Sequence, residues 1–136
     1  MKIPAGFREI SHTADWQLEA WAPDLSGLLE QAAAGMYALA GIRLQPGPRI
    51  QRSLRIERSD PERLLVAFLR ELLYLSERER LAFDQLNLHQ DENTLEADLF
   101  GGLIANQDKE IKAVTYHNLV IRSDEQGLSV NIVFDV

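Results

Sequence analysis

The stretch His12-Thr13-Ala14-Asp15 leads directly into Trp16-Gln17-Leu18-Glu19-Ala20, and the fold can be worked out from this junction. In the second stretch apolar and polar residues alternate, which is typical of a strand with one buried face. The first stretch is short and polar, so it predicts a loop that follows an earlier strand at Phe7-Arg8-Glu9-Ile10. An imidazole, a hydroxyl and a carboxylate therefore lie together at the end of a strand.

Two helices are predicted further along the chain. Asp24 is a suitable N-cap for the first helix, and Gly41 suits its C-terminal end. Ser59-Asp60-Pro61-Glu62 starts the second helix, because proline fits the first helical position and Asp60 can cap the amides behind it. Each helix has an apolar stripe at helical spacing: Leu25, Leu28, Leu29, Ala32, Ala33, Met36, Leu39 and Ala40 on the first, and Leu64, Leu65, Phe68, Leu69, Leu72 and Leu75 on the second.

Further strands are predicted between and after the helices. Residues 50–57 alternate in polarity, and the apolar positions of residues 81–88 change phase, which indicates a bulge or a bend. Gly101-Gly102 is expected to end the strand that contains Leu95. An extended segment is expected over residues 111–121, followed by a hairpin loop and a last strand with Leu128, Val130, Ile132 and Phe134 facing inward.

These elements predict an α+β fold. Two helices and about seven strands, mostly joined by short turns, indicate a two-layer sandwich of a mixed, mainly antiparallel sheet with two helices. The length of 136 residues favours a single domain over residues 1–136.

Composition excludes several classes of function. The chain has no cysteine, which excludes disulfides, thiolate metal sites and cysteine nucleophiles. Its net charge of −7 weighs against a domain that binds RNA or DNA through its own phosphate contacts, although a protein that works on a nucleic-acid enzyme stays open. No signal peptide and no apolar run of ~18 residues are evident. We therefore expect a cytoplasmic protein.

Carboxylates at strand ends are the main chemical candidates. Asp15 precedes one strand, and Asp135 with the terminal carboxylate of Val136 ends another. If the two strand ends meet, these carboxylates share a small volume, and two carboxylates ~4 Å apart repel by roughly 4 kcal/mol at an effective dielectric of about 20. Such a cluster needs a cation, a proton or a basic side chain. Oxygen ligands alone suit a hard cation such as calcium or magnesium.

The residues by themselves leave simpler interpretations open. Asp15 could cap a turn, and Asp135 could be a solvated residue near the chain end. His12 is either a ligand or proton carrier, or a loop residue that orders the backbone. Lys112 has the position of an exposed residue at a sheet edge. No glycine-rich phosphate loop, serine nucleophile elbow or histidine pair at ligand spacing is present.

Five blocks in the right order give the chain a resemblance to the archease family over essentially its whole length. The blocks are His12-Thr13-Ala14-Asp15, Asp24-Leu25 with Gly35-Met36, Leu69-Arg70-Glu71-Leu72-Leu73-Tyr74-Leu75, Ile111-Lys112-Ala113-Val114-Thr115-Tyr116-His117, and the ending Asp135-Val136. The resemblance implies an archease-like domain that is a protein cofactor and not itself an enzyme. Such a protein activates an RtcB-type RNA ligase, promoting its GTP-dependent guanylylation and multiple turnover in tRNA splicing or RNA repair.

The resemblance also implies roles for individual residues. The family's metal-binding positions fall on Asp15, Asp135 and the terminal carboxylate of Val136, with a divalent, calcium- or magnesium-like cation as the cofactor. The family's functionally important lysine falls on Lys112, and His12 is a second candidate for ligase activation. The partner implied is the ligase, without stable direct nucleic-acid binding and without a membrane. Family members often carry a histidine in the loop before Lys112, and residues 103–109 here have none.

Other functions stay in competition with ligase activation. A general chaperone or modulator of RNA-processing or tRNA-modifying enzymes would bind its partners through apolar surface and need no metal. A small metal-dependent hydrolase would use the same carboxylates, but the chain offers no obvious general base beyond His12. An acidic domain without a metal is the simplest alternative.

Overall fold

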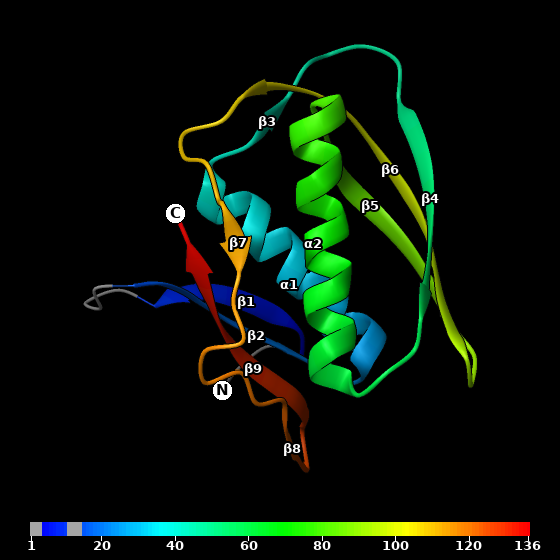
Figure 1. Ribbon diagram of the computed structural model, residues 1–136, viewed down its shortest axis with the longest axis vertical. Helices are drawn as coiled ribbons and strands as arrows, with labels where there is room; N and C mark the ends of the chain where they lie inside the picture. Colours follow the sequence, from blue (N-terminus) through cyan, green and yellow to red (C-terminus); the bar gives the residue numbers. More distant parts are fainter. Residues whose placement is uncertain (1–3, 11–14) are drawn as a thin grey trace.

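The computed structural model describes residues 4–10 and 15–136, and in this part of the chain it contains nine strands and two helices (Figure 1). None of the described helices is long and apolar enough to cross a membrane. In chain order the elements are β1 (Gly6–Ile10), β2 (Trp16–Ala22), α1 (Leu25–Ala40), β3 (Arg43–Leu44), β4 (Ile50–Glu57), α2 (Pro61–Glu79), β5 (Leu81–Gln90), β6 (Thr94–Asn106), β7 (Ala113–Val114), β8 (Arg122–Asp124) and β9 (Gly127–Asp135).

Local hydrogen bonds fix the ends of both helices. The Asp24 side chain accepts a hydrogen bond from the Gly27 amide at 2.8 Å, and the Asp60 side chain accepts one from the Arg63 amide at 2.9 Å. Helix α1 ends at Gly41, whose φ of 66° is the left-handed conformation that glycine adopts without strain. The predicted caps and the proline at the start of α2 are confirmed.

The larger sheet joins the two ends of the chain. Its strand order is β1-β2-β9-β7, and β8 pairs with β9, so β9 is the strand on which three others pair. Strand β2 pairs with β9 over its whole length, from Trp16 opposite Phe134 to Ala22 opposite Leu128. Every pairing between described strands is antiparallel. We refer to this five-stranded sheet as the terminal sheet.

The four-stranded sheet is built from the middle of the chain, residues 43–106, and we call it the central sheet. Its long strand β6 pairs with β4, β5 and β3. The predicted phase change in β5 is a register shift between Phe83 and Gln85. At this shift a Cβ on Gly101 would lie 1.9 Å from the Ala82 carbonyl oxygen, so only glycine permits the close approach of the two strands.

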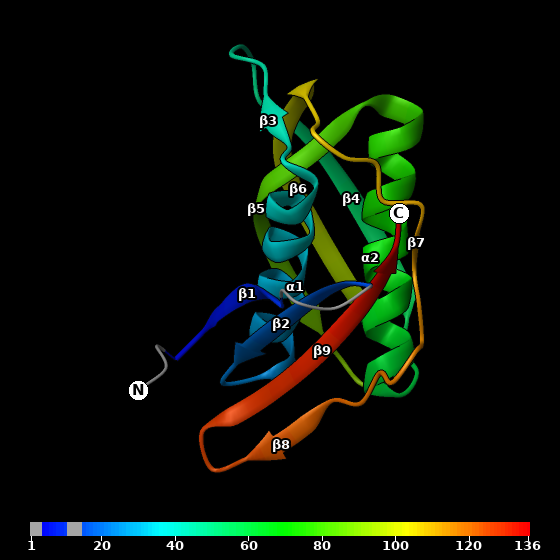
Figure 2. The same cartoon turned by 90° about the vertical axis from the view of Figure 1, so that its left-hand side faces the viewer.

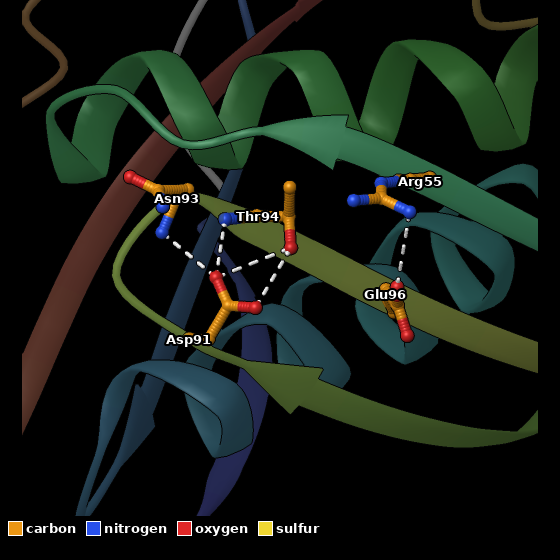
Figure 3. A network of polar contacts seen from close by, with 5 residues as sticks. All are labelled: Arg55, Asp91, Asn93, Thr94 and Glu96. Atoms are coloured by element: carbon orange, nitrogen blue, oxygen red, sulfur yellow. Dashed lines mark hydrogen bonds and ion pairs between the residues drawn. The ribbon is translucent and has the colours of Figure 1, made fainter.

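Short-range hydrogen bonds hold the turn between β5 and β6 in the central sheet. Asp91 Oδ1 accepts hydrogen bonds from the amides of Asn93 and Thr94, both at 2.7 Å, in the turn between β5 and β6 (Figure 3). These amide bonds hold the pKa of Asp91 below its usual range. On the next pair of strands Arg55 faces Glu96 at 3.6 Å (Figure 3). Residues close in sequence thus satisfy the polar groups of this turn.

Both helices contact both sheets (Figures 1 and 2). Their buried stripes form the core together with the inner faces of the two sheets. The predicted α+β sandwich of two helices and mainly antiparallel strands is confirmed by this arrangement and by its structural relatives described below. The strands are divided between two sheets, because β6 and β9 each collect their own neighbours.

Two local predictions were wrong. Gly101 and Gly102 lie inside β6, which continues to Asn106, because the glycines accommodate the bulge in β5 and do not end the strand. The segment over residues 111–121 is strand only at Ala113–Val114, because β9 offers it just two paired positions before the chain turns away along α2. Both errors concern contacts between distant parts of the chain.

Candidate functional site

Three strand ends meet at one edge of the terminal sheet. Strand β2 begins at Trp16, β9 ends at Asp135, and β7 begins at Ala113. Phe134 pairs with Trp16 on one side and with Val114 on the other, so the three ends lie level with one another. We call the residues gathered here, Asp15, Lys112, Asp135 and Val136, the strand-end cluster.

The register places the two aspartates on neighbouring strands. The last pair between β2 and β9 is Trp16 with Phe134, and one residue further along each strand come Asp15 and Asp135. In an antiparallel pair such residues lie side by side on one face. Both side chains are exposed. Asp135 also lies opposite Ala113, the first residue of β7.

Lys112 is joined to the cluster through its backbone. Its amide donates a hydrogen bond to the Asp135 carbonyl at 2.7 Å, and its side chain is exposed. The half-buried Val136 follows Asp135 directly. The backbone of Lys112 is thus bonded to the segment that carries Asp135.

Lys109 is a further cation at this edge, and sequence reasoning did not single it out. Its ammonium lies 4.0 Å from the centre of the Trp16 ring, a cation–π contact. The loop that carries Lys109 is fixed, because the amides of Asp108 and Lys109 donate to the Ala40 carbonyl at 2.9 and 3.0 Å. In the sequence, no pattern distinguishes this lysine from the other charged residues of its loop.

A hollow borders the cluster on the side of α2. It has a volume of about 430 Å³ and lies between the last turns of the helix and the loop that leads to β7. Its lining is mostly polar and charged: Leu73, Ser76, Glu77, Arg80, Ala105, Asn106, Gln107, Asp108, Lys109, Glu110 and Ile111. The hollow ends at Ile111, next to the exposed Lys112.

The structure brings together four of the five predicted site residues. Asp15, Lys112, Asp135 and Val136 belong to the strand-end cluster. His12, with Thr13 and Ala14, lies outside the described residues, so its predicted role stays a prediction.

The donor chemistry of the cluster fits a hard cation. Asp15 and Asp135 offer carboxylate oxygen atoms only, which is the ligand type of calcium and magnesium. Within residues 4–10 and 15–136, no three histidine, cysteine, aspartate or glutamate side chains gather closely enough to form a metal site by themselves. A cation here would depend on main-chain oxygens, the chain terminus or water as well as on the two aspartates.

Comparison with known proteins bears on these residues. The model of the family described as "Archease protein family (MTH1598/TM1083)" matches residues 7–136. This chain belongs to the archease family. The resemblance drawn from the five sequence blocks is thereby confirmed, and the matched residues include the strand-end cluster.

Archeases from archaea are similar to this chain over most of its length. The protein archease of Pyrobaculum neutrophilum is 30% identical over 143 residues, which cover 98% of this chain and 97% of that protein. The protein archease of Thermococcus gammatolerans is 31% identical over 124 residues, which cover 85% of this chain and 87% of that protein.

Two solved structures share the archease fold of this chain. The solution structure of Methanobacterium thermoautotrophicum protein 1598 has a TM-score of 0.70 at 21% identity and covers 96% of this chain and 99% of that one. A crystal structure from Thermotoga maritima, described as an archease and possible chaperone, has a TM-score of 0.68 at 22% identity and covers 100% of this chain and 98% of that one. At these identities the likeness concerns the fold.

Proposed function

We propose that this archease is a protein cofactor that activates an RtcB-type RNA ligase in the cytoplasm, promoting its GTP-dependent guanylylation and repeated turnover. The observation that carries the proposal is the strand-end cluster. Asp15, Lys112 and Asp135 come from three separate segments and reach one exposed edge in a chain of this family. Exposed charged groups from distant segments suit the binding of a ligand better than the support of a fold.

Each residue of the cluster has a separate task in this proposal. Asp15 and Asp135, with the terminal carboxylate of Val136, would hold a calcium- or magnesium-like cation. When bound, such a cation neutralises charge on phosphate oxygens. Lys112, which directly precedes β7, would offer a point charge to the same oxygens. His12 would act with Lys112 in ligase activation.

Charge supports contact with an RNA-processing enzyme. The chain has a net charge of −7, and Asp15 and Asp135 are exposed. An enzyme that binds RNA and GTP carries basic side chains at its active site, so opposite charges favour this orientation of encounter. We therefore expect the acidic edge to face the ligase active site.

A guanylylation assay tests the proposal. The cognate ligase is incubated with labelled GTP and a divalent metal, with and without this protein, and the covalently labelled ligase is quantified over time. We expect stimulation by the wild type and loss of stimulation with Asp135→Ala. The matched control is Asp98→Ala, which removes a carboxylate of the central sheet that accepts a hydrogen bond from the Ser53 hydroxyl at 3.0 Å. Equal stimulation by all three proteins would contradict a role for the cluster.

A general chaperone is the second candidate, because the Thermotoga maritima relative is described as a possible chaperone. This function would use apolar surface, and the described part of the chain exposes the large hydrophobic side chains Phe7, Tyr74, Leu103, Tyr116 and Val120. The two functions separate in one comparison. A chaperone would suppress aggregation of a heated RNA-modifying enzyme equally well with Asp135→Ala, whereas a ligase activator would lose its effect on the ligase.

A further inference from the structure

Helix α2 has a companion along its exposed side. The segment that leads through β7 runs antiparallel to the helix, from the hollow beside Arg80 to the first turn, where the Ile121 amide donates to the Glu62 carboxylate at 3.0 Å (Figure 1). Between these ends Arg70 lies over the Tyr116 ring, 5.5 Å from its centre. The helix and the segment thus form one continuous surface, and Lys112 lies within it.

Tyrosine and arginine alternate along this surface. Tyr116 stacks with Arg70, Tyr74 follows one helical turn later, and Arg78 lies 5.7 Å from the centre of the Tyr74 ring. Arg70, Tyr74 and Arg78 follow one another at intervals of about 6 Å along the axis of α2, because four helical residues rise by that distance. We call Arg70, Tyr74, Arg78 and Tyr116 the tyrosine–arginine face.

The rings on this face remain open to solvent. Tyr74 is 52% exposed and Tyr116 48% exposed, although each ring is already in contact with an arginine guanidinium. The neighbouring Val120 is 52% exposed, so three of the five exposed large hydrophobic side chains of the described residues lie on the α2 side of the molecule. The stacked arginines restrict the rings before anything binds, which lowers the entropy lost on association.

We propose that the tyrosine–arginine face is a second docking surface for the protein partner, the RtcB-type ligase, and that it supplies affinity while the strand-end cluster acts on the active site. This inference rests on the proposed function. The face is continuous with Lys112, so one partner can cover both. Tyrosine and arginine dominate the binding energy of protein interfaces when they lie in a packed centre.

Charge favours a protein over RNA as the occupant. The two arginines share the exposed side of α2 with Glu71 and Glu77, so the local charge is balanced. A single strand of RNA needs a positive groove beside its stacking platforms. A protein surface with an apolar pocket for Tyr74 and carboxylates for Arg70 and Arg78 meets every group on this face.

The test separates affinity from activation. The dissociation constant for the cognate ligase is measured by calorimetry, and the guanylylation rate is measured over a range of concentrations of this protein. With Tyr74→Ala we expect the dissociation constant and the half-maximal concentration to rise about tenfold, with the same maximal stimulation. With Asp135→Ala we expect the maximal stimulation to fall. Leu103→Ala, on β6 and 43% exposed in the wild type, is the control and should change neither value.

A second variant guards against a folding defect. Arg70→Glu keeps a long side chain but reverses the charge beside Tyr116, and it should weaken binding as Tyr74→Ala does, while Tyr74→Phe should restore it. Melting curves establish that each variant is folded.

Several outcomes overturn the docking surface. Unchanged affinity in both variants would do so, as would a wild type that does not bind the ligase. A single-stranded RNA whose binding is lost with Tyr74→Ala would assign the face to RNA, and a wild-type dimer that Tyr74→Ala dissociates would assign it to a second copy. If Tyr74→Ala weakens binding as expected but the wild type does not stimulate guanylylation, the docking surface would stand and the proposed activation would be contradicted.

Discussion

The turn between β5 and β6 and the strand-end cluster place their carboxylates in different ways. In the central sheet, Asp91 is satisfied by amides two and three residues away in its own turn. In the terminal sheet, Asp15 and Asp135 are brought side by side by strands that lie at opposite ends of the sequence. A carboxylate bonded within its own turn serves the fold. Carboxylates that distant segments bring side by side repel one another, and the proposed cation would relieve this repulsion.

The strongest way to break this contrast is to damage the central sheet alone. We expect Gly101→Ala to lower the free energy of unfolding by about 3 kcal/mol, because the new methyl would lie 1.9 Å from the Ala82 oxygen and 2.7 Å from Phe83 Cα. Gly102→Ala is a close control, since its Cβ would meet only the Gln45 oxygen at 3.9 Å and should change stability by less than about 1 kcal/mol. Urea unfolding measures both. Similar losses of unfolding free energy in the two variants would contradict a special requirement for glycine at Gly101.

Calcium should act on the terminal sheet only. At a free concentration about 100 times its dissociation constant, a cation that binds only the folded state raises the free energy of unfolding by about 2.7 kcal/mol. We expect this rise, measured as an increase in melting temperature, in the wild type and in Asp98→Ala but not in Asp135→Ala. Magnesium should give a smaller rise, because it demands stricter geometry. A rise that survives Asp135→Ala would place the cation elsewhere.

Removing the Lys109 side chain should change stability less than the two preceding tests. Its exposed contact with Trp16 corresponds to about 0.5–1 kcal/mol, so Lys109→Ala should lower stability by no more than that. The same change removes a positive charge near the strand-end cluster, and calcium should then bind more tightly. Calorimetry measures the calcium affinity, and Lys109→Arg, which keeps the charge and the stacking, is the control. Weaker calcium binding in Lys109→Ala would mean that the lysine supports the site.

The smallest expected effect is the pH dependence from Asp91. Its pKa in the folded protein is lowered by the Asn93 and Thr94 amides, so the ionised form stabilises the fold above the pKa of the unfolded chain, ~3.9. This stabilisation is lost as the pH falls through the folded pKa. We expect wild type to melt slightly above Asp91→Asn at ~pH 7 and the gap to close below ~pH 4. A difference in melting temperature that widens in acid would contradict a stabilising role of the ionised Asp91.

Local chemistry made part of this structure predictable. The caps at Asp24, Asp60 and Gly41 use groups within a few residues of one another, so the sequence pattern contains all the information. The phase change in β5 likewise showed that a bulge was needed. Its partner Gly101 could not be recognised from the sequence, because its role depends on a strand that approaches from another part of the chain.

The candidate functional site was likewise predictable only in part. The pattern predicted carboxylates at two strand ends, and the family resemblance indicated which ones matter. The pattern did not indicate Lys109 over Trp16 or Arg70 over Tyr116, because each pair joins segments far apart in sequence. Contacts of this kind depend on tertiary packing, which hydrophobic periodicity does not contain.

The position of β9 has a consequence for synthesis. Strands β2, β7 and β8 all pair with it, and Phe134 reaches Trp16 across most of the chain. A ribosome needs on the order of ten seconds to translate the residues between them. During that time the hydrogen-bonding edge of β2 lacks its native neighbour, and an unpaired edge invites association with other nascent chains. The molecule is thus most vulnerable to aggregation just before its last strand emerges, and substitutions that slow the docking of β9 should reduce the yield of folded protein in cells more than they reduce equilibrium stability.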